Sequence, residues 1–133
     1  MKTYLFILLV VSGFGIGTFQ ASNAALLAGS WKFRDLKAEY PKTMHGKALA
    51  DAKKDIQGDI KRMKNSPFIF AQDGKCTIGE HHGTWTMSRG GKKVTYINEK
   101  KEKEVVNVLQ LSEHKLVFSR VDDSVKQTFI LTK

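Results

Sequence analysis

The feature that most constrains this fold is a series of short alternating segments, separated by turns, which runs from residue 67 to residue 132. Within segments such as Thr84-Trp85-Thr86-Met87, polar and apolar residues alternate with the period of two that is typical of half-buried strands. Turn signals such as Asp73-Gly74 and Gly90-Gly91 separate the segments. An earlier segment, Ser30 to Arg34, alternates in the same way. The predicted strands cover residues 29–35, 67–72, 75–80, 83–88, 92–98, 104–111, 115–121 and 125–132.

Residues 41–64 have a different period. Pro41 is able to start a helix at its first turn. Apolar residues then recur at steps of three and four, while lysines and aspartates occupy the opposite side, so this region is predicted to be an amphipathic helix. Gly58 lies within the pattern and permits a kink or two shorter helices. The stripe lacks aromatic residues, which favours packing against a sheet over binding to a membrane surface. Its members are Leu49, Ala52, Ile56, Ile60 and Met63.

Eight short strands with short connectors predict antiparallel pairing between neighbours in the sequence. Because closure removes exposed sheet edges, the pattern favours a closed barrel over an open sheet. The predicted fold is therefore mainly β, an antiparallel up-and-down barrel of eight strands with one helical insertion after the first strand.

The N-terminus is typical of a secretory signal peptide. Lys2 supplies a positive charge, residues 4–11 are apolar, and Ser22-Asn23-Ala24 places small residues where cleavage occurs. The apolar run is too short for a comfortable membrane span, which needs about 20 mostly apolar residues. We therefore expect a signal peptide over residues 1–24 and one barrel domain over residues 25–133. The product would be exported, and soluble in the periplasm or outside the cell.

The chain is basic, with a formal net charge of +9 and a pI near 9.7. The positive charge is scattered, and no segment interleaves arginine with aromatic residues as a base-stacking surface would. We therefore expect no nucleic-acid partner. A basic surface does favour long-range attraction to anionic lipids or polyanionic sugars, so an anionic envelope surface is retained as a partner class.

Sequence motifs for catalysis and metal binding were weak or absent. The chain has no nucleophile elbow, no phosphate-binding glycine loop and no His-Glu-X-X-His motif, so no enzyme activity, metal or cofactor is predicted. His81 and His82 are the best metal candidates, but neighbours on a strand point to opposite faces. Cys76 is the only cysteine, which excludes an internal disulfide, and a buried apolar role is expected for it.

Three motifs, in this order along the chain, resemble those of the small bacterial lipocalin-like domains of exported proteins. They are Leu27 to Trp31 with its Gly-X-Trp pattern, Phe68 to Gly74 with its Phe-X-Phe and Asp-Gly pairs, and Gly83-Thr84-Trp85. The resemblance implies a lipocalin-like barrel in which Gly29, Trp31, Gly83 and Trp85 are structural. It also implies a late-strand arginine over the first tryptophan, for which Arg120 is the candidate. Both tryptophans are interpreted as core residues, because large aromatics dominate small cores.

Two functions remain open. The first is non-enzymatic binding of a small hydrophobic or amphipathic ligand inside the barrel, since barrel interiors and mouths commonly hold such ligands. The alternative is an envelope interaction or structural protein whose barrel is filled by side chains, with a site on the outer surface or on the charged loop at residues 99–104. For the first function, strand alternation predicts these inward-facing ligand-binding residues: Phe33, Phe70, Met87, Tyr96, Leu109, Phe118 and Phe129.

Overall fold

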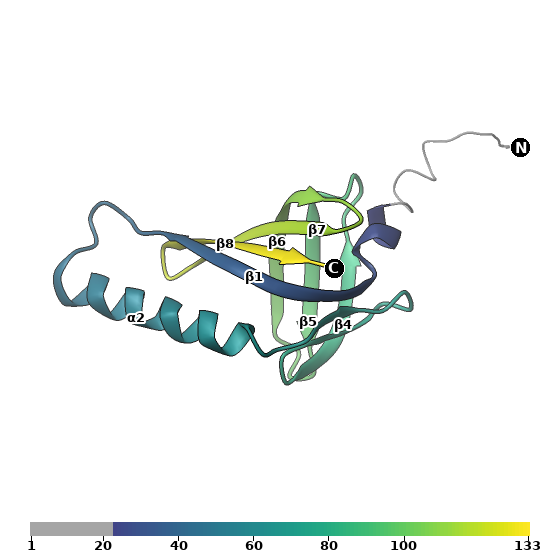
Figure 1. Ribbon diagram of the computed structural model, residues 1–133, viewed down its shortest axis with the longest axis horizontal. Coiled ribbons are helices and arrows are strands. Elements are labelled where there is room, and N and C mark those ends of the chain that lie inside the picture. Colours follow the sequence, from purple (N-terminus) through teal and green to yellow (C-terminus); the bar gives the residue numbers. More distant parts are fainter. Residues whose placement is uncertain (1–22) are drawn as a thin grey trace, which may run out of the picture.

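The strands close into one barrel in which each strand pairs with the next and the last pairs with the first (Figure 1). The computed structural model describes residues 23–133. All pairings are antiparallel, and one helix, α2, follows the first strand, so the predicted fold class is confirmed and is consistent with a lipocalin-like barrel. The strands are β1 (Gly29–Glu39), β2 (Phe68–Phe70), β3 (Lys75–Ile78), β4 (His81–Met87), β5 (Lys93–Asn98), β6 (Lys103–Leu111), β7 (Lys115–Asp122) and β8 (Val125–Thr132).

Strand β1 is four residues longer than the predicted range of 29–35. A bulge shifts the phase of its side chains, so that apolar residues return to the buried face. Trp31 and Phe33 face the interior, and the register with β8 then shifts between Phe33 and Asp35. Arg34 and Asp35 are both exposed as a result, and Leu36 returns to the interior. A bulge of this kind adds one residue without losing the buried face of the strand. The strand therefore continues to Glu39, well beyond the point where strict alternation fails.

Helix α2 (Gly46–Met63) lies alongside the ends of β1 and β8 that extend from the barrel (Figure 1). It is one continuous helix through Gly58, and it begins at Gly46, so the expected start at Pro41 is wrong. Ile56 is buried in the same hydrophobic cluster as Leu36, and the flanking stripe residues Ala52 and Ile60 pack against it. Within residues 23–133, no helix is both long enough and apolar enough to cross a membrane.

A short helical segment at residues 23–27 leads into β1 on the side of the barrel opposite α2 (Figure 1). Leu27 is 1% exposed, and its carbonyl oxygen accepts a hydrogen bond of 2.7 Å from the Trp31 indole nitrogen. This segment therefore covers one end of the barrel, which we call the closed end. The expected cleavage point after Ala24 falls within this helix. The rest of the expected signal peptide, residues 1–22, lies outside the described residues.

Candidate functional site

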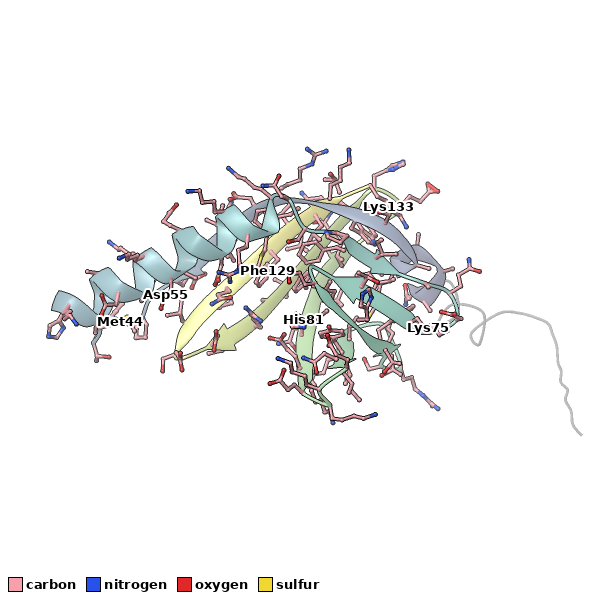
Figure 2. The ribbon with its side chains drawn as sticks, turned by 90° about the horizontal axis from the view of Figure 1, so that it is seen from below. Met44, Asp55, Lys75, His81, Phe129 and Lys133 are labelled. Carbon is pink, nitrogen blue, oxygen red and sulfur yellow. The ribbon has the colours of Figure 1, made fainter. Side chains whose placement is uncertain are left out.

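The barrel contains a cavity of about 680 Å³. Its lining runs from Leu27 and Leu116, both buried, to the C-terminal end of α2 and the turn between β3 and β4. The exposed members of the lining gather at this second end, so the cavity opens there, away from the closed end. Figure 2 shows α2, which includes Asp55, extending from the barrel on the side opposite Lys133, with Met44 just before its start. The exposed lining residues are Arg62, Asn65, Pro67, Glu80 and His81.

Most of the cavity wall is apolar, because six of the strands contribute aliphatic or aromatic side chains to it. The rings of Phe118 and Phe129, on the paired strands β7 and β8, stack with their centres 4.8 Å apart. The surface is suited to a ligand with a hydrocarbon portion, because small-molecule sites are mostly apolar with few polar groups. The apolar lining residues on the strands are Phe68, Phe70, Ile78, Val94, Val106, Val108, Leu116, Phe118 and Phe129.

A row of four polar side chains crosses the inner wall on the neighbouring strands β5 to β8. We call Tyr96, Glu104, Arg120 and Gln127 the inner polar row. Arg120 Nη1 donates to Glu104 Oε2 at 2.5 Å, and Arg120 Nε donates to Gln127 Oε1 at 3.0 Å. Tyr96 and Glu104 are cross-strand partners, as are Arg120 and Gln127, so the row follows the register of the sheet. The guanidinium carbon of Arg120 also lies 5.2 Å from the centre of the Phe129 ring.

The Tyr96 hydroxyl differs from the other polar groups of this row in its hydrogen bonding. Tyr96 lines the cavity, and its hydroxyl is buried and has no hydrogen-bond partner among residues 23–133. Burial raises the pKa of Tyr96 to about 12, with smaller contributions from negative charge at Cys76, Glu99, Glu104 and Glu102. At neutral pH the hydroxyl is therefore protonated and able to donate a hydrogen bond. An unpaired buried donor is costly, which makes it a natural contact for a polar group on a ligand.

The seven predicted ligand-binding residues fall into three groups. Four of them line the cavity: Phe70, Tyr96, Phe118 and Phe129. Phe33 and Met87 pack in or against the core but are outside the cavity lining.

Leu109 is 56% exposed, so its predicted inward position is wrong. Strand β6 is apolar on both faces, which made its phase ambiguous, and a bulge between Val108 and Gln110 leaves Leu109 outside.

Sequence reasoning missed the charged members of the inner polar row. Glu104 was predicted as the first residue of the strand at 104–111 and as the end of the charged loop at 99–104; it lies in β6, and the prediction did not include that it faces the cavity. Arg120 also lines the cavity, so its predicted place over Trp31 is wrong, and Lys133 occupies that place. Strand alternation could have predicted their inward position. Arg120 is two residues from Phe118, and Glu104 is two residues from Val106, so each pair shares one face of its strand.

The predicted structural residues lie around the cavity. Neither Trp31 nor Trp85 is among the lining residues. The Trp85 indole nitrogen donates to the Ala71 carbonyl oxygen at 2.9 Å, and its ring meets that of Phe70 edge-on. Gly29 lies beneath the Lys133 side chain, and Gly83 lies close against the backbone of β5 at Ile97 and Asn98.

The histidine candidates do not come together. His81 Nδ1 lies 3.3 Å from Glu99 Oε1, while His82 Nδ1 lies 3.1 Å from Thr77 Oγ1, and both side chains are exposed. Over residues 23–133, no three His, Cys, Asp or Glu side chains are close enough to hold a metal ion. Burial raises the pKa of Cys76 to about 11, so its thiol is protonated at neutral pH.

Comparison with known proteins adds no family to these observations. No protein-family model matches the sequence, and no curated protein matches it as a relative. The candidate site therefore stands on its geometry: an apolar cavity with an inner polar row and one unpartnered donor.

Proposed function

We propose that this protein binds a small amphipathic molecule in the barrel cavity, without converting it. The observation that carries the proposal is the cavity of about 680 Å³, whose mostly apolar lining includes Tyr96 with its buried, unpartnered hydroxyl. Ligand pockets typically measure about 300–1,000 Å³ and combine an apolar lining with a few polar groups. The cavity has both properties.

The arrangement of the lining supports an amphipathic ligand over a purely hydrocarbon one. The wall between the inner polar row and the closed end is formed by side chains such as Leu116, Phe118 and Val108. The hydrocarbon part would lie there, where its burial is worth about 25 cal/mol per Å². The polar part would then lie beside Tyr96 and Arg120.

The alternative, an envelope protein with a barrel filled by side chains, has less support. A filled barrel leaves no space of this volume, although eight strands can be filled completely. Export to the envelope or beyond remains part of the proposal, on the basis of the signal-peptide pattern in residues 1–24.

Two neighbouring valines on β6 provide a matched test of the cavity. Val106 lines the cavity, while Val105 is 44% exposed on the outer face. The barrel domain would be titrated with Nile red, an uncharged fluorescent dye that reports an apolar environment. We expect saturable binding at one site per molecule. Val106→Phe should weaken it by about tenfold or more, equivalent to about 1.4 kcal/mol, and Val105→Phe should leave it unchanged.

Absence of saturable binding to the wild-type protein would overturn the proposal, as would equal effects of the two phenylalanine substitutions. Circular dichroism of each variant checks that the barrel is folded. Native mass spectrometry of protein from its own host provides a second measurement, in which a bound small molecule is expected to co-purify.

A further inference from the structure

We propose that the cavity selects ligands whose polar group is uncharged, such as an alcohol or an ester, and discriminates against carboxylates. This inference rests on the proposed function and names the ligand class for the same cavity. Its basis is the inner polar row, in which the one cation is already paired with a carboxylate and the Tyr96 hydroxyl has no partner among residues 23–133.

The charge of Arg120 is compensated within the protein. Its side chain is 23% exposed and forms an ion pair of 2.5 Å with Glu104, whose side chain is 40% exposed, while Gln127 accepts from Nε. Arginine inside a cavity is ordinarily a good partner for a ligand carboxylate. Here Glu104 occupies that position. A ligand carboxylate would have to displace Glu104 or lie beside it, and two like charges side by side disfavour each other.

The hydrogen-bond donors that remain suit an acceptor without charge. The Tyr96 hydroxyl has no partner, and the Nη2 group of Arg120 forms no hydrogen bond with any residue in 23–133. Tyr96 is the cross-strand partner of Glu104, and Glu104 accepts from Arg120, so these three residues adjoin one another. An alcohol or ester oxygen can accept from these donors while the ion pair stays intact.

The other charged residues of the lining do not alter this balance. Arg62, Glu80 and His81 lie at the exposed rim of the cavity, where water screens their charges. Arg62 is also paired with Asp59, and His81 with Glu99. The part of the cavity that would enclose the ligand therefore has one positive and one negative charge, in contact with each other.

The test compares ligands with the same hydrocarbon chain and different polar groups. Dodecanol, methyl dodecanoate, dodecanoate and protonated dodecylamine would each displace Nile red from the wild-type protein at pH 7.5. We expect the alcohol and the ester to compete at concentrations about tenfold or more below those of the two charged compounds, since a tenfold preference requires about 1.4 kcal/mol. Tighter competition by dodecanoate or by the amine would overturn the inference, and so would equal competition by all four.

Two variants separate the roles of the inner polar row. Glu104→Gln frees Arg120 and should strengthen dodecanoate binding by about tenfold or more, with little change for dodecanol. Tyr96→Phe should weaken the binding of dodecanol and of the ester severalfold relative to that of dodecanoate, because the variant lacks the hydroxyl donor. Glu113→Gln, at an exposed residue in the turn between β6 and β7, is the matched control and should change nothing.

The outcomes distinguish this inference from the proposed function. If Nile red shows saturable binding but dodecanoate competes best, the proposed preference for uncharged ligands is wrong and the binding function stands. If Nile red does not bind to the wild-type protein, both are wrong. Should Glu104→Gln fail to fold, the competition series on the wild-type protein decides the question alone.

Discussion

The ammonium group of Lys133 lies 4.6 Å from the centre of the Trp31 indole ring, at the closed end of the barrel. The same Nζ atom donates hydrogen bonds to the carbonyl oxygens of Leu26 at 2.9 Å and Ala28 at 2.6 Å. Lys133 directly follows β8, so these contacts join the end of β8 to the segment that leads into β1. The Trp31 indole nitrogen donates to Leu27, so one tryptophan and one lysine hold this segment against the barrel.

Replacing Lys133 with alanine should lower the free energy of unfolding by about 1–2 kcal/mol. The variant loses a cation–π contact and leaves two carbonyl oxygens without their charged donor. Urea unfolding monitored by tryptophan fluorescence measures the effect. Lys37→Ala on β1, where the lysine is exposed, is the control and should be close to neutral. If both alanine variants unfold at the same urea concentration as wild type, the contact has no stabilising role.

Gly83 is required by the close approach of β4 to β5. A β carbon at this position would lie 2.0 Å from the Ile97 carbonyl oxygen and 2.9 Å from the Asn98 α carbon. Both are backbone atoms, so the strands themselves would have to separate. Gly83→Ala should therefore destabilise the protein by about 3 kcal/mol, at the upper end for overpacking.

Gly58→Ala in α2 is the opposite case and controls for glycine replacement in general. The nearest atom to its added β carbon is Arg62 Nη1 at 4.0 Å, and the backbone is helical. Alanine should stabilise the helix by about 0.5–1 kcal/mol. Urea unfolding of the two variants should shift in opposite directions, and a shared direction would contradict this account.

The strand pattern could be predicted because each turn carries local signals. Asp73-Gly74, Gly90-Gly91 and Asp122-Asp123 end strands within a residue or two of the predicted positions. The first strand and the sixth were harder, because a bulge changes the phase of the side chains. Local alternation contains no information about a bulge, so Leu36 to Glu39 were missed in β1 and Leu109 was placed on the wrong face.

The cavity was less predictable than the fold. Its volume depends on how all inward side chains fill the closed barrel, which is a property of the tertiary structure. Phe70, Tyr96, Phe118 and Phe129 were identified because they are large and lie at inward positions. The pairing of Arg120 with Glu104 joins residues that are 16 positions apart on two strands, and no local pattern in the sequence links them.

Cys76 should be almost unreactive in the folded protein. Its side chain is 4% exposed, and burial raises the pKa of the thiol from 9.0 to about 11. A rise of two units lowers the thiolate fraction at neutral pH by about a hundredfold, and the thiolate is the reactive form. A chromogenic disulfide reagent at pH 7.5 should therefore react at least about 100-fold more slowly with native than with urea-unfolded protein.

A control for this measurement places the thiol on the outer face of β2. Ile69 is 39% exposed, so Ile69→Cys in a Cys76→Ala background should react quickly in the folded state. Rapid reaction of wild-type Cys76 under native conditions would show that the barrel opens readily at β3.

Tyr96 should make the protein less stable as the solution becomes alkaline. Burial raises the pKa of its hydroxyl from 10.0 to about 12 in the folded state, so the unfolded chain loses this proton first. Between about pH 10 and pH 12 the folded state binds more protons than the unfolded state, and the free energy of unfolding falls as pH rises. Cys76 acts in the same direction between about pH 9 and pH 11.

Tyr96→Phe removes this contribution and keeps the aromatic ring. The variant should lose stability less steeply than wild type above pH 10, in urea unfolding measured from pH 7 to pH 11. At pH 7 it should be at least as stable as wild type, because an unpartnered buried hydroxyl costs about 1–3 kcal/mol when no water or ligand satisfies it. Tyr40→Phe, outside the cavity, is the control and should follow the wild-type curve. Parallel pH profiles for wild type and Tyr96→Phe would mean that the hydroxyl titrates as it does in water, and that it is not enclosed by the barrel.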